Sequence, residues 1–254
     1  MIRDERTLSV PDGSRLLWRS GKHRCAACTL NAVQVLACVF DAYGTLFDYA
    51  SAAAQSSASL GASADRLTRL WREKQLQYTW LRSLQGRHAD FRQVTADALD
   101  YTLASLELGD PALRESLMDS YLTLDPFPEV PGVLERIRKM GIRTAILSNG
   151  SPAMLRAAVS HARIESFFDA VLSVEEVGVY KPHPKVYQLA VDRLGVESAR
   201  IAFVSSNGWD AWAASAFGMQ VVWCNRYRQQ PERLPGHPDY EIRSLTELPF
   251  LDRS

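Results

Sequence analysis

Hydrophobic positions along the chain follow two patterns, one typical of buried strands and one typical of helices. Residues 33–40 (VQVLACVF) form an apolar run rich in β-formers, as expected for a strand buried on both faces of a sheet. Residues 51–125 carry apolar residues at helical spacing instead, over 67–84, 91–106 and 112–124. Beyond residue 132, helical segments alternate with short apolar runs. The helical segments are 133–140, 152–162, 184–195 and 210–218, and the apolar runs are 144–150, 170–174, 201–206 and 220–225.

This alternation predicts the fold class. Strands that alternate with helices of about 10–15 residues indicate βαβ units and a parallel sheet. The helical block interrupts the series after its first strand, so we expect an α/β fold: a Rossmann-like parallel sheet core with an inserted all-helical cap subdomain. The core domain is expected over 33–50 and 126–254, and the cap over 51–125. Residues 1–32 lack periodicity and a signal-peptide apolar region, so they are expected to form a disordered N-terminal extension.

Composition and net charge argue against some classes of binding partner. Hydrophobic residues make up 46% of the chain, charged residues 23%, and the formal net charge is zero. This balance gives no electrostatic reason to expect nucleic acid or an anionic membrane as a partner. No apolar run approaches the roughly 20 residues that a membrane span needs.

The spacing of the four cysteines does not indicate a metal site. Cys25 and Cys28 form a CAAC motif, but a zinc site needs a second pair of ligands, and only His23 lies nearby. Cys38 and Cys224 lie in apolar runs, where cysteine behaves as a small core residue. A reducing, cytoplasmic location is therefore expected.

Polar and charged residues follow four of the expected strands. Asp41 ends the first strand, Ser148 and Asn149 end the second, Lys181 lies in the loop after the third, and residues 205–210 (SSNGWD) follow the fourth. Right-handed crossovers bring the carboxyl ends of parallel strands to one edge, where ligands bind. Two carboxylates, one ammonium and several hydroxyl and amide groups are thus expected to converge there.

Five stretches of the sequence resemble one family. They are FDAYGTLFD, LWREKQLQYTWLRSL, ILSNGSP, VYKPHPKVY and FVSSNGWDA, and they are similar to the L-2-haloacid dehalogenases of the haloacid dehalogenase superfamily. The resemblance covers roughly residues 35–250. It implies metal-independent hydrolytic dehalogenation of short-chain L-2-haloalkanoic acids to D-2-hydroxyalkanoic acids through an aspartyl ester. The implied partners are the haloacid and water, without a cofactor, and a homodimer formed through the cap is compatible with it.

The residue types at the strand ends fit an enzyme that works without a metal. Phosphatases of this superfamily carry a second Asp two positions after the nucleophile, where this chain has Tyr43, a phenol with an ordinary pKa near 10. Asp210 is the only carboxylate in the fourth strand-end loop, whereas magnesium prefers several oxygen ligands. A halide leaves as a stable anion and needs no general acid, so a dehalogenase can dispense with the second Asp.

The resemblance assigns catalytic roles to residues of this chain. Asp41 is the nucleophile, Asp210 orients or deprotonates water, and Lys181 holds Asp41 ionised and shares in activating water. Whether Asp210 or Lys181 activates the water molecule stays open. Supporting roles fall to Thr45 as a hydrogen-bond donor to Asp41, Ser205 and Asn207 as orienting groups for Lys181 and Asp210, and Tyr187 as a tie for the lysine loop.

Substrate recognition follows from the same resemblance. Ser148, with the backbone N–H groups of Tyr43 and Asn149, suits the substrate carboxylate. Arg72 of the cap suits the departing halide, with help from Asn149. The apolar wall is expected from Tyr43, Leu76, Phe91 and Trp209.

Several alternatives remain at this stage. A member of the family carries Gln after the cap arginine, where this chain has Glu73, which we expect to face solvent. The stripe Trp71, Tyr78, Trp80 and Leu81 is expected to form cap core or a subunit interface. His183 lies two residues after Lys181, but the spacing of the histidines does not indicate a metal site. The competing functions are a small-molecule phosphatase of the same superfamily and a catalytically silent scaffold protein.

Overall fold

The computed structural model describes residues 34–49 and 60–251, apart from the side chain of Ala62. The extension expected over 1–32, with Cys25 and Cys28, lies outside these residues.

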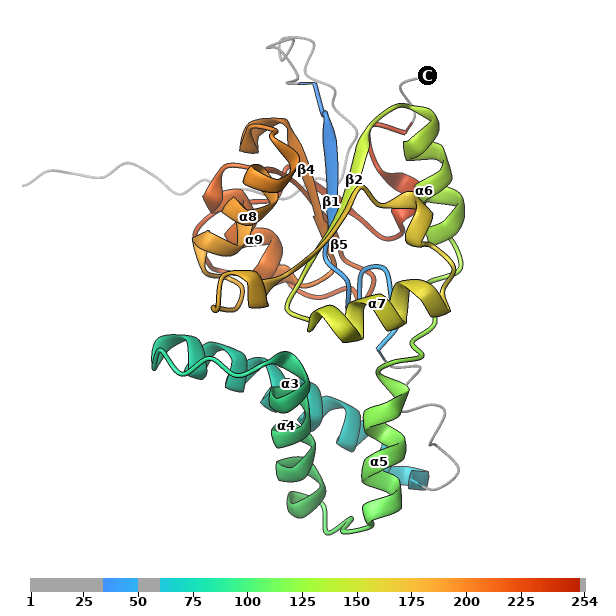
Figure 1. Cartoon of the computed structure of the whole chain (residues 1–254), viewed down its shortest axis with the longest axis vertical. Helices are drawn as coiled ribbons and strands as arrows, with labels where there is room; N and C mark the ends of the chain where they lie inside the picture. The colour runs from blue at the N-terminus through green and yellow to red at the C-terminus, as the bar shows by residue number, and fades with distance from the viewer. Residues whose placement is uncertain (1–33, 50–59, 252–254) are drawn as a thin grey trace, which may run out of the picture. The chain divides into compact units, whose positions relative to one another are not determined.

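A six-stranded sheet forms the centre of the core, with the strand order β3-β2-β1-β4-β5-β6. All five pairings between neighbouring strands are parallel (Figure 1). The central strand β1 is fully buried, as its continuous apolar run predicted. The strands are β1 (Ala37–Phe40), β2 (Arg143–Ser148), β3 (Ala170–Ser173), β4 (Ile201–Ser205), β5 (Gln220–Cys224) and β6 (Tyr240–Ile242).

Two strands differ from the prediction. The first strand was expected from residue 33 but begins at Ala37, where its pairing with both Arg143 and Ile201 starts. Strand β6 was not predicted. It has three residues at the edge of the sheet, and two of them are exposed, so it lacks the apolar run that marks the other strands.

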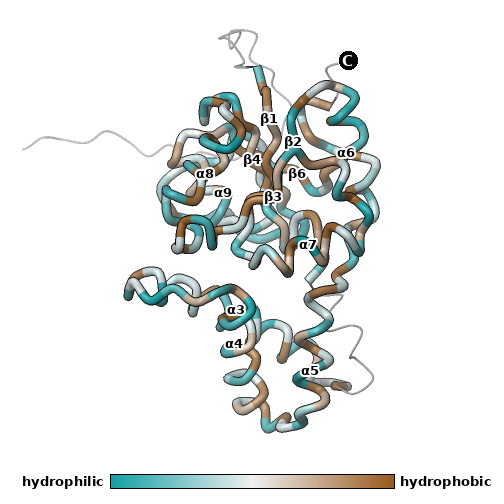
Figure 2. Tube along the Cα trace, viewed as in Figure 1, coloured by the Kyte–Doolittle hydropathy of each residue, from teal (hydrophilic) through white to brown (hydrophobic). Residues whose placement is uncertain are grey.

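In the described part of the chain, four α-helices cover the two faces of the sheet. α6 (Val130–Lys139) and α7 (Pro152–His161) lie on one face, and α8 (Pro184–Leu194) and α9 (Gly208–Phe217) lie on the other (Figure 1). This division follows from right-handed crossovers, because the chain moves outward from β1 in one direction and later returns to extend the sheet in the other. Figure 2 shows hydrophobic residues gathered along the strands that these helices cover.

Local signals set the ends of these helices. Ser151 caps α7 by accepting a hydrogen bond from the Met154 N–H at 3.4 Å, and a proline follows each of the caps of α7 and α8. Gly195 ends α8 in the left-handed region, with φ of 61°, which glycine adopts without steric cost.

Among the described residues, three α-helices between β1 and α6 form the cap. They are α3 (Ala64–Leu84), α4 (Phe91–Ser105) and α5 (Pro111–Ser120), and α3 packs along α4. The indole N–H of Trp71 donates to the Thr95 carbonyl at 2.9 Å, and the Gln75 amide donates to the Thr95 hydroxyl at 2.8 Å. The predicted fold class, an α/β core with an inserted helical cap, is confirmed. Its division at residues 50 and 126 stays a prediction.

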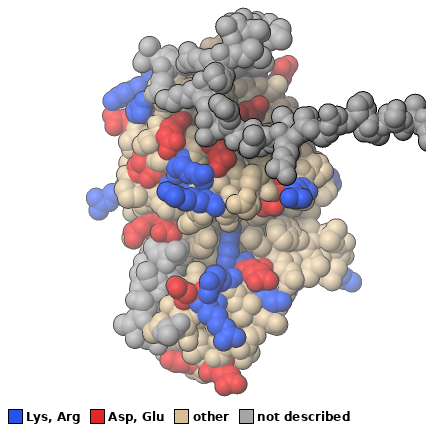
Figure 3. Space-filling view, turned by 180° about the vertical axis from the view of Figure 1, so that it is seen from behind, with Lys and Arg blue, Asp and Glu red and all other residues tan. Residues whose placement is uncertain are grey.

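The surface carries both signs of charge. On the face in Figure 3, Lys and Arg are interspersed with Asp and Glu, in keeping with the formal net charge of zero. Within residues 34–49 and 60–251, no helix combines the length and the apolar character that crossing a membrane requires.

Candidate active site

Three charged side chains meet at the carboxyl edge of the sheet. The Lys181 ammonium nitrogen Nζ lies 3.1 Å from Asp41 Oδ1 and 2.8 Å from Asp210 Oδ2. Lys181 is 1% exposed, Asp41 6% and Asp210 0%. One ammonium is therefore shared by two carboxylates where little water screens the charges, and the structure brings together the three residues that sequence reasoning placed at one edge.

The topology of the sheet explains this convergence. Asp41 directly follows β1, which lies between β2 and β4, and its backbone N–H donates to the Val204 carbonyl of β4 at 2.9 Å. The chain runs outward from β1 in opposite directions on its two sides, so the site lies at the topological switch point of the sheet. Asp210 belongs to the first turn of α9, just past the end of β4.

Two neutral donors hold the second oxygen of Asp41. The Thr45 hydroxyl donates to Asp41 Oδ2 at 3.2 Å, as expected, within a turn that includes Gly44 at φ of 85°. The Asn207 amide also donates to Asp41 Oδ2, at 2.8 Å, and to the Tyr43 carbonyl at 3.2 Å. The backbone carbonyl of Asn207 accepts a hydrogen bond from the Asp210 N–H at 3.1 Å, and its expected role in orienting Lys181 and Asp210 stays a prediction. Asn207 lies immediately before α9, and its side chain faces the turn after β1.

Two hydroxyl groups fix the carboxylate of Asp210. The Ser205 hydroxyl donates to Oδ2 at 3.1 Å, which agrees with its expected orienting role. The Tyr187 hydroxyl donates to Oδ1 at 2.7 Å. The bond to the second carboxylate was not expected, and the expected role of Tyr187 as a tie for the lysine loop stays a prediction. The bond forms because α8 presents this buried side chain to α9.

Burial and charge shift the pKa values of this cluster in opposing ways. Burial raises the pKa of Asp210, and the adjacent Lys181 ammonium only partly offsets this, so the pKa lies above its ordinary value. Burial lowers the pKa of Lys181, but Asp210 and Asp41 outweigh it and raise this pKa. Burial and the charge of Asp210 also raise the pKa of Tyr187, which stays a neutral hydrogen-bond donor.

The cap reaches the core site through Arg72. This half-buried residue donates from Nη2 to the Asn207 side-chain oxygen at 3.3 Å and from Nη1 to the Gln75 side-chain oxygen at 2.7 Å. Its guanidinium also lies 5.3 Å from the centre of the Tyr49 ring. Glu73 is exposed, as expected. Sequence reasoning missed Gln75 and Tyr49, although a polar residue three positions after Arg72 on one helix was a usable signal for Gln75.

The end of β2 contributes two buried polar side chains. The Ser148 hydroxyl oxygen accepts a hydrogen bond from the Gly150 N–H at 3.1 Å, and the Asn149 side-chain oxygen accepts one from the Lys181 N–H at 3.1 Å. Asn149 thus anchors the backbone of the lysine, a contact that the sequence did not predict.

Aromatic rings line the cap side of the cluster. The Tyr43 ring stacks on Phe91 at a centroid distance of 5.7 Å and lies 5.9 Å from Tyr121. The Tyr43 hydroxyl is buried and has no hydrogen-bond partner among the described residues, so it is available to a ligand. A Cβ atom at Gly150 would lie 2.8 Å from this hydroxyl, which explains the glycine there.

The two remaining wall residues lie beyond these rings. Leu76 is half-buried one turn along α3 from Arg72. Trp209, also half-buried, lies 5.5 Å from Trp80 of α3, measured between ring centroids.

The donor set is a poor match for magnesium. The two carboxylates at this edge both bind an ammonium, whereas magnesium prefers oxygen ligands in near-octahedral geometry. Among the described residues, no group of three or more His, Cys, Asp and Glu is placed to hold a metal ion.

An ion pair behind the turn that follows β1 was also missed. Arg226, after β5, donates from Nη2 to the Thr45 carbonyl at 2.9 Å and from Nη1 to Glu129 Oε1 at 2.6 Å. Both side chains are largely buried, at 10% and 17% exposed, and the guanidinium lies 3.9 Å from the centre of the Phe127 ring. The pair fixes the backbone of the turn that carries Thr45. No regular spacing in the sequence predicts the contacts of Arg226 with Glu129 and Thr45.

Comparisons with known proteins agree with this geometry. Residues 35–218 match the family model of the haloacid dehalogenase-like hydrolases. An (S)-2-haloacid dehalogenase of Pseudomonas sp. strain YL is 46% identical over 81% of this chain and 89% of its own length. An (S)-2-haloacid dehalogenase of Pseudomonas sp. strain CBS-3 is 43% identical over 85% of this chain and 96% of its own length.

A solved structure agrees as well. The L-2-haloacid dehalogenase of Xanthobacter autotrophicus, with chloropropionic acid covalently bound, is 38% identical with a TM-score of 0.81. The match covers 87% of this chain and 99% of the other. The chain therefore belongs to the haloacid dehalogenase-like hydrolases and, within them, to the family of the (S)-2-haloacid dehalogenases.

Proposed function

We propose that this protein hydrolyses short-chain L-2-haloalkanoic acids to D-2-hydroxyalkanoic acids without a metal ion. The observation that carries the proposal is the buried Lys181 ammonium shared by Asp41 and Asp210, in a chain 46% identical to an (S)-2-haloacid dehalogenase. The covalently bound chloropropionic acid in the Xanthobacter autotrophicus relative supports a covalent route.

In the first step, the Asp41 carboxylate attacks C2 of the substrate from the side opposite the halogen. A carbon–oxygen bond forms, the carbon–halogen bond breaks, and halide leaves with the bonding electron pair. The configuration at C2 inverts, and the product of this step is an ester of Asp41. Lys181 and Asn207, which bind the two oxygens of Asp41, orient the carboxylate for attack.

In the second step, water attacks the carbonyl carbon of the Asp41 ester. Asp210 accepts a proton from this water, and its orientation is held by Ser205 and Tyr187. The bond between the Asp41 carbonyl carbon and the ester oxygen breaks with its electron pair on that oxygen, which takes up the proton held by Asp210 and leaves as the hydroxyl of the hydroxy acid. The carboxyl group formed on Asp41 gives its remaining proton to solvent, which regenerates the carboxylate. The Lys181 ammonium stabilises the negative charge that develops, and the new Asp41 oxygen comes from water.

Substrate binding draws on groups that still have hydrogen-bonding capacity. The Ser148 hydroxyl accepts from the Gly150 N–H, so its own proton can be donated to the substrate carboxylate. The backbone N–H groups of Tyr43 and Asn149 are assigned to the same carboxylate. A guanidinium has five N–H donors, more than the bonds of Arg72 to Gln75 and Asn207 use, so Arg72 can bind the departing halide.

The walls of the site are assigned to Tyr43, Phe91, Leu76 and Trp209. Apolar walls exclude water and strengthen the charge interactions of the nucleophile. A cytoplasmic location and a homodimer remain part of the proposal. Buried, unpaired Cys38 and Cys224 are compatible with a reducing compartment.

Halide release from each enantiomer of 2-chloropropionate, with a metal chelator present, tests the proposal. We expect chloride from the L enantiomer only, at a rate that the chelator leaves unchanged. Loss of activity on chelation, or turnover of a chromogenic phosphate ester with added magnesium, would favour the phosphatase alternative. No release under any condition would favour a silent scaffold.

A further inference from the structure

Gln75 of α3 is a buried polar side chain to which the proposed mechanism gives no role. It is 0% exposed and follows Arg72 by three positions, so the two side chains are neighbours on the surface of the helix. Burying an amide costs free energy unless its hydrogen bonds are made. The partners of Gln75 therefore indicate what the amide does.

The hydrogen bonds of Gln75 fix the orientation of its amide. The oxygen accepts from Arg72 Nη1 at 2.7 Å, and the nitrogen donates to the Thr95 hydroxyl of α4 at 2.8 Å. The Thr95 hydroxyl gives its own proton to the Phe91 carbonyl at 2.6 Å, so it can only accept from Gln75. A guanidinium has donors alone. Both ends thus require the same orientation, with the amide oxygen toward Arg72.

An amide suits this position better than a carboxylate does. Besides Thr95, the Tyr121 side chain at the end of α5 is hydrogen-bonded to Gln75. A carboxylate could accept from Arg72, but it has no N–H for Thr95. Its negative charge would also offset the positive charge with which Arg72 attracts an anion. Gln75 holds the guanidinium and leaves that charge intact.

Arg72 is anchored at two of its nitrogens. Gln75 binds Nη1, and the Asn207 side-chain oxygen accepts from Nη2 at 3.3 Å, while the Asn207 amide donates to Asp41 at 2.8 Å. Because a guanidinium is planar and rigid, two anchors set its plane and the directions of its remaining N–H groups. Without Gln75, the guanidinium could turn about the contact with Asn207.

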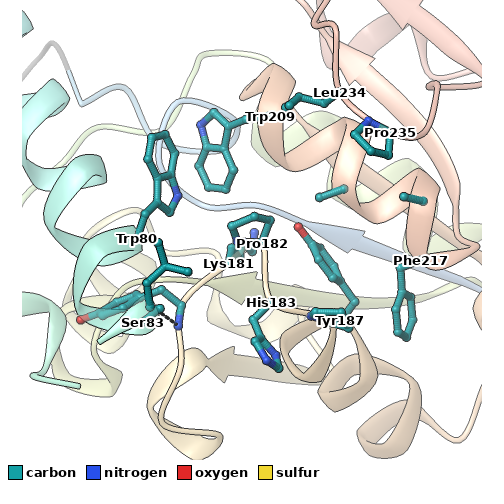
Figure 4. A pocket seen from close by; sticks show the side chains of 15 residues that line it. Trp80, Ser83, Lys181, Pro182, His183, Tyr187, Trp209, Phe217, Leu234 and Pro235 are labelled. Carbon is teal, nitrogen blue, oxygen red and sulfur yellow. Dashed lines mark hydrogen bonds between the residues drawn. The ribbon is translucent and has the colours of Figure 1, made fainter. Parts of the chain in front are cut away.

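The backbone of α3 is held against the core independently of Gln75. The Ser83 hydroxyl accepts from the Tyr180 N–H at 3.1 Å, and the Trp80 ring meets the Trp209 ring edge to face at 5.5 Å between centroids (Figure 4). Both contacts lie further along the helix than Gln75. Loss of the Gln75 amide should therefore free the Arg72 side chain and leave α3 docked.

We propose that Gln75 is a positioning residue for the first chemical step, because its amide oxygen holds Arg72 in the orientation that receives the departing halide. The inference rests on the proposed function, which assigns the halide to Arg72, and adds a residue that determines which leaving groups are accepted. Chloride is smaller than iodide, so its charge is more concentrated and gains more from an oriented donor. Gln75 should therefore matter more for chloride than for iodide.

Gln75→Met tests this role, since methionine is similar in length and lacks the amide. The readout is the single-turnover rate of halide release from L-2-chloropropionate and from L-2-iodopropionate, with enzyme in excess. We expect chloride release to slow on the order of tenfold and iodide release by about threefold, so the chloride-to-iodide ratio falls. Partial misfolding would lower both rates equally and leave the ratio unchanged, and an unchanged ratio overturns the proposal.

The second chemical step provides an independent readout. Rapid quenching and mass spectrometry of the peptide that carries Asp41 follow the formation and the loss of the ester. Halide has left before water attacks, so Gln75→Met should form the ester slowly and hydrolyse it at the wild-type rate. Equal slowing of both steps would mean a general loosening of the site and would overturn the proposal.

Two control variants should keep the wild-type ratio. Trp71→Phe removes the 2.9 Å bond to the Thr95 carbonyl in the same contact between α3 and α4, and it leaves the amide of Gln75 in place. Gln77→Met repeats the substitution at a glutamine that accepts from Lys74 at 2.8 Å. A fall in the ratio for Trp71→Phe as large as that for Gln75→Met overturns the proposal.

Thr95→Val loosens Gln75 without replacing it. Valine has nearly the shape of threonine but lacks the hydroxyl that accepts from the amide. We expect the chloride-to-iodide ratio to fall by about twofold. If Gln75→Met does not fold, Thr95→Val decides alone, and a wild-type ratio in it overturns the proposal. Chloride release by the wild type supports the proposed dehalogenation whichever way the variants behave, whereas its absence would overturn that function itself.

Discussion

Replacing Lys181 by Met removes the cation that binds both Asp41 and Asp210. The Nζ contacts are 3.1 Å to Asp41 and 2.8 Å to Asp210, and the three side chains are at most 8% exposed. Solvent screening reduces the contribution of an exposed ion pair to stability to about 0–1 kcal/mol, and this screening is small for such buried side chains. Leaving a buried charge without its partner costs about 3–5 kcal/mol. We expect Lys181→Met to lower the free energy of unfolding at pH 7 by that amount.

The pH dependence of this loss identifies its cause. Without the ammonium, the folded-state pKa of Asp210 should rise further above its unfolded value of about 3.9. A carboxyl whose folded-state pKa is raised contributes stability below the unfolded pKa and loses it as the pH rises through the folded pKa. The deficit of the variant should therefore shrink on acidification from pH 7 toward pH 4, and the double variant Lys181→Met/Asp210→Asn should recover part of it.

Guanidinium chloride unfolding of wild type and variants between pH 4 and pH 7 measures these differences. The matched control is Lys139→Met, which breaks the exposed pair with Glu135 and should leave stability unchanged. If Lys181→Met were as stable as wild type at pH 7, or if its deficit did not change with pH, the reasoning from buried charge would be refuted. Halide release by the variant should be lost in either case.

Two further predictions concern the pH dependence of turnover and the ion pair of Arg226. The acid limb of kcat should lie above about pH 3.9, because the pKa of Asp210 is raised and its ionised form accepts the proton when water attacks the ester. The alkaline limb should lie above about pH 10.4, because the pKa of Lys181 is raised. An acid limb at or below the ordinary Asp value would contradict this assignment. Arg226→Met should lower the free energy of unfolding by about 1.5–3 kcal/mol, since it removes charge-assisted bonds to Glu129 and to the Thr45 carbonyl. Arg193→Met, which breaks an exposed pair, is the control in the same denaturant titration, and equal losses would contradict a special role for Arg226.

The convergence of Asp41, Lys181 and Asp210 could be predicted because it depends on topology. Alternating periodicities indicate βαβ units, and right-handed crossovers then force the carboxyl ends of all parallel strands to one edge. Residues that follow different strands become neighbours whatever their separation in the sequence. The cap could be predicted for a similar reason, since α3, α4 and α5 show helical spacing where strands are absent.

The partners of individual side chains could not be predicted in this way. The bond from the Asn207 side chain to Asp41 and the bond from the Tyr187 hydroxyl to Asp210 were not predicted. These choices depend on rotamers and on the direction in which a helix presents its first turn, which periodicity does not specify. The contact of Arg226 with the Thr45 carbonyl is equally non-local, because it joins the loop after β5 to the turn after β1.

Strand β6 could not be predicted from the pattern of hydrophobic residues. Its three residues pair only with β5, and two of them are exposed, so neither a buried run nor a full alternation marks it. Short edge strands owe their conformation to the neighbour that offers hydrogen bonds, and the sequence shows that neighbour only once the sheet order is known.

The formation of an Asp41 ester is tested most directly by a single turnover in heavy-oxygen water with enzyme in excess of L-2-chloropropionate. Mass spectrometry then locates the label. We predict heavy oxygen in the Asp41 carboxylate and none in the hydroxy acid released, because water attacks the ester carbonyl and the product keeps an oxygen of Asp41. Heavy oxygen in the product of that first turnover, with none in Asp41, would contradict the ester mechanism.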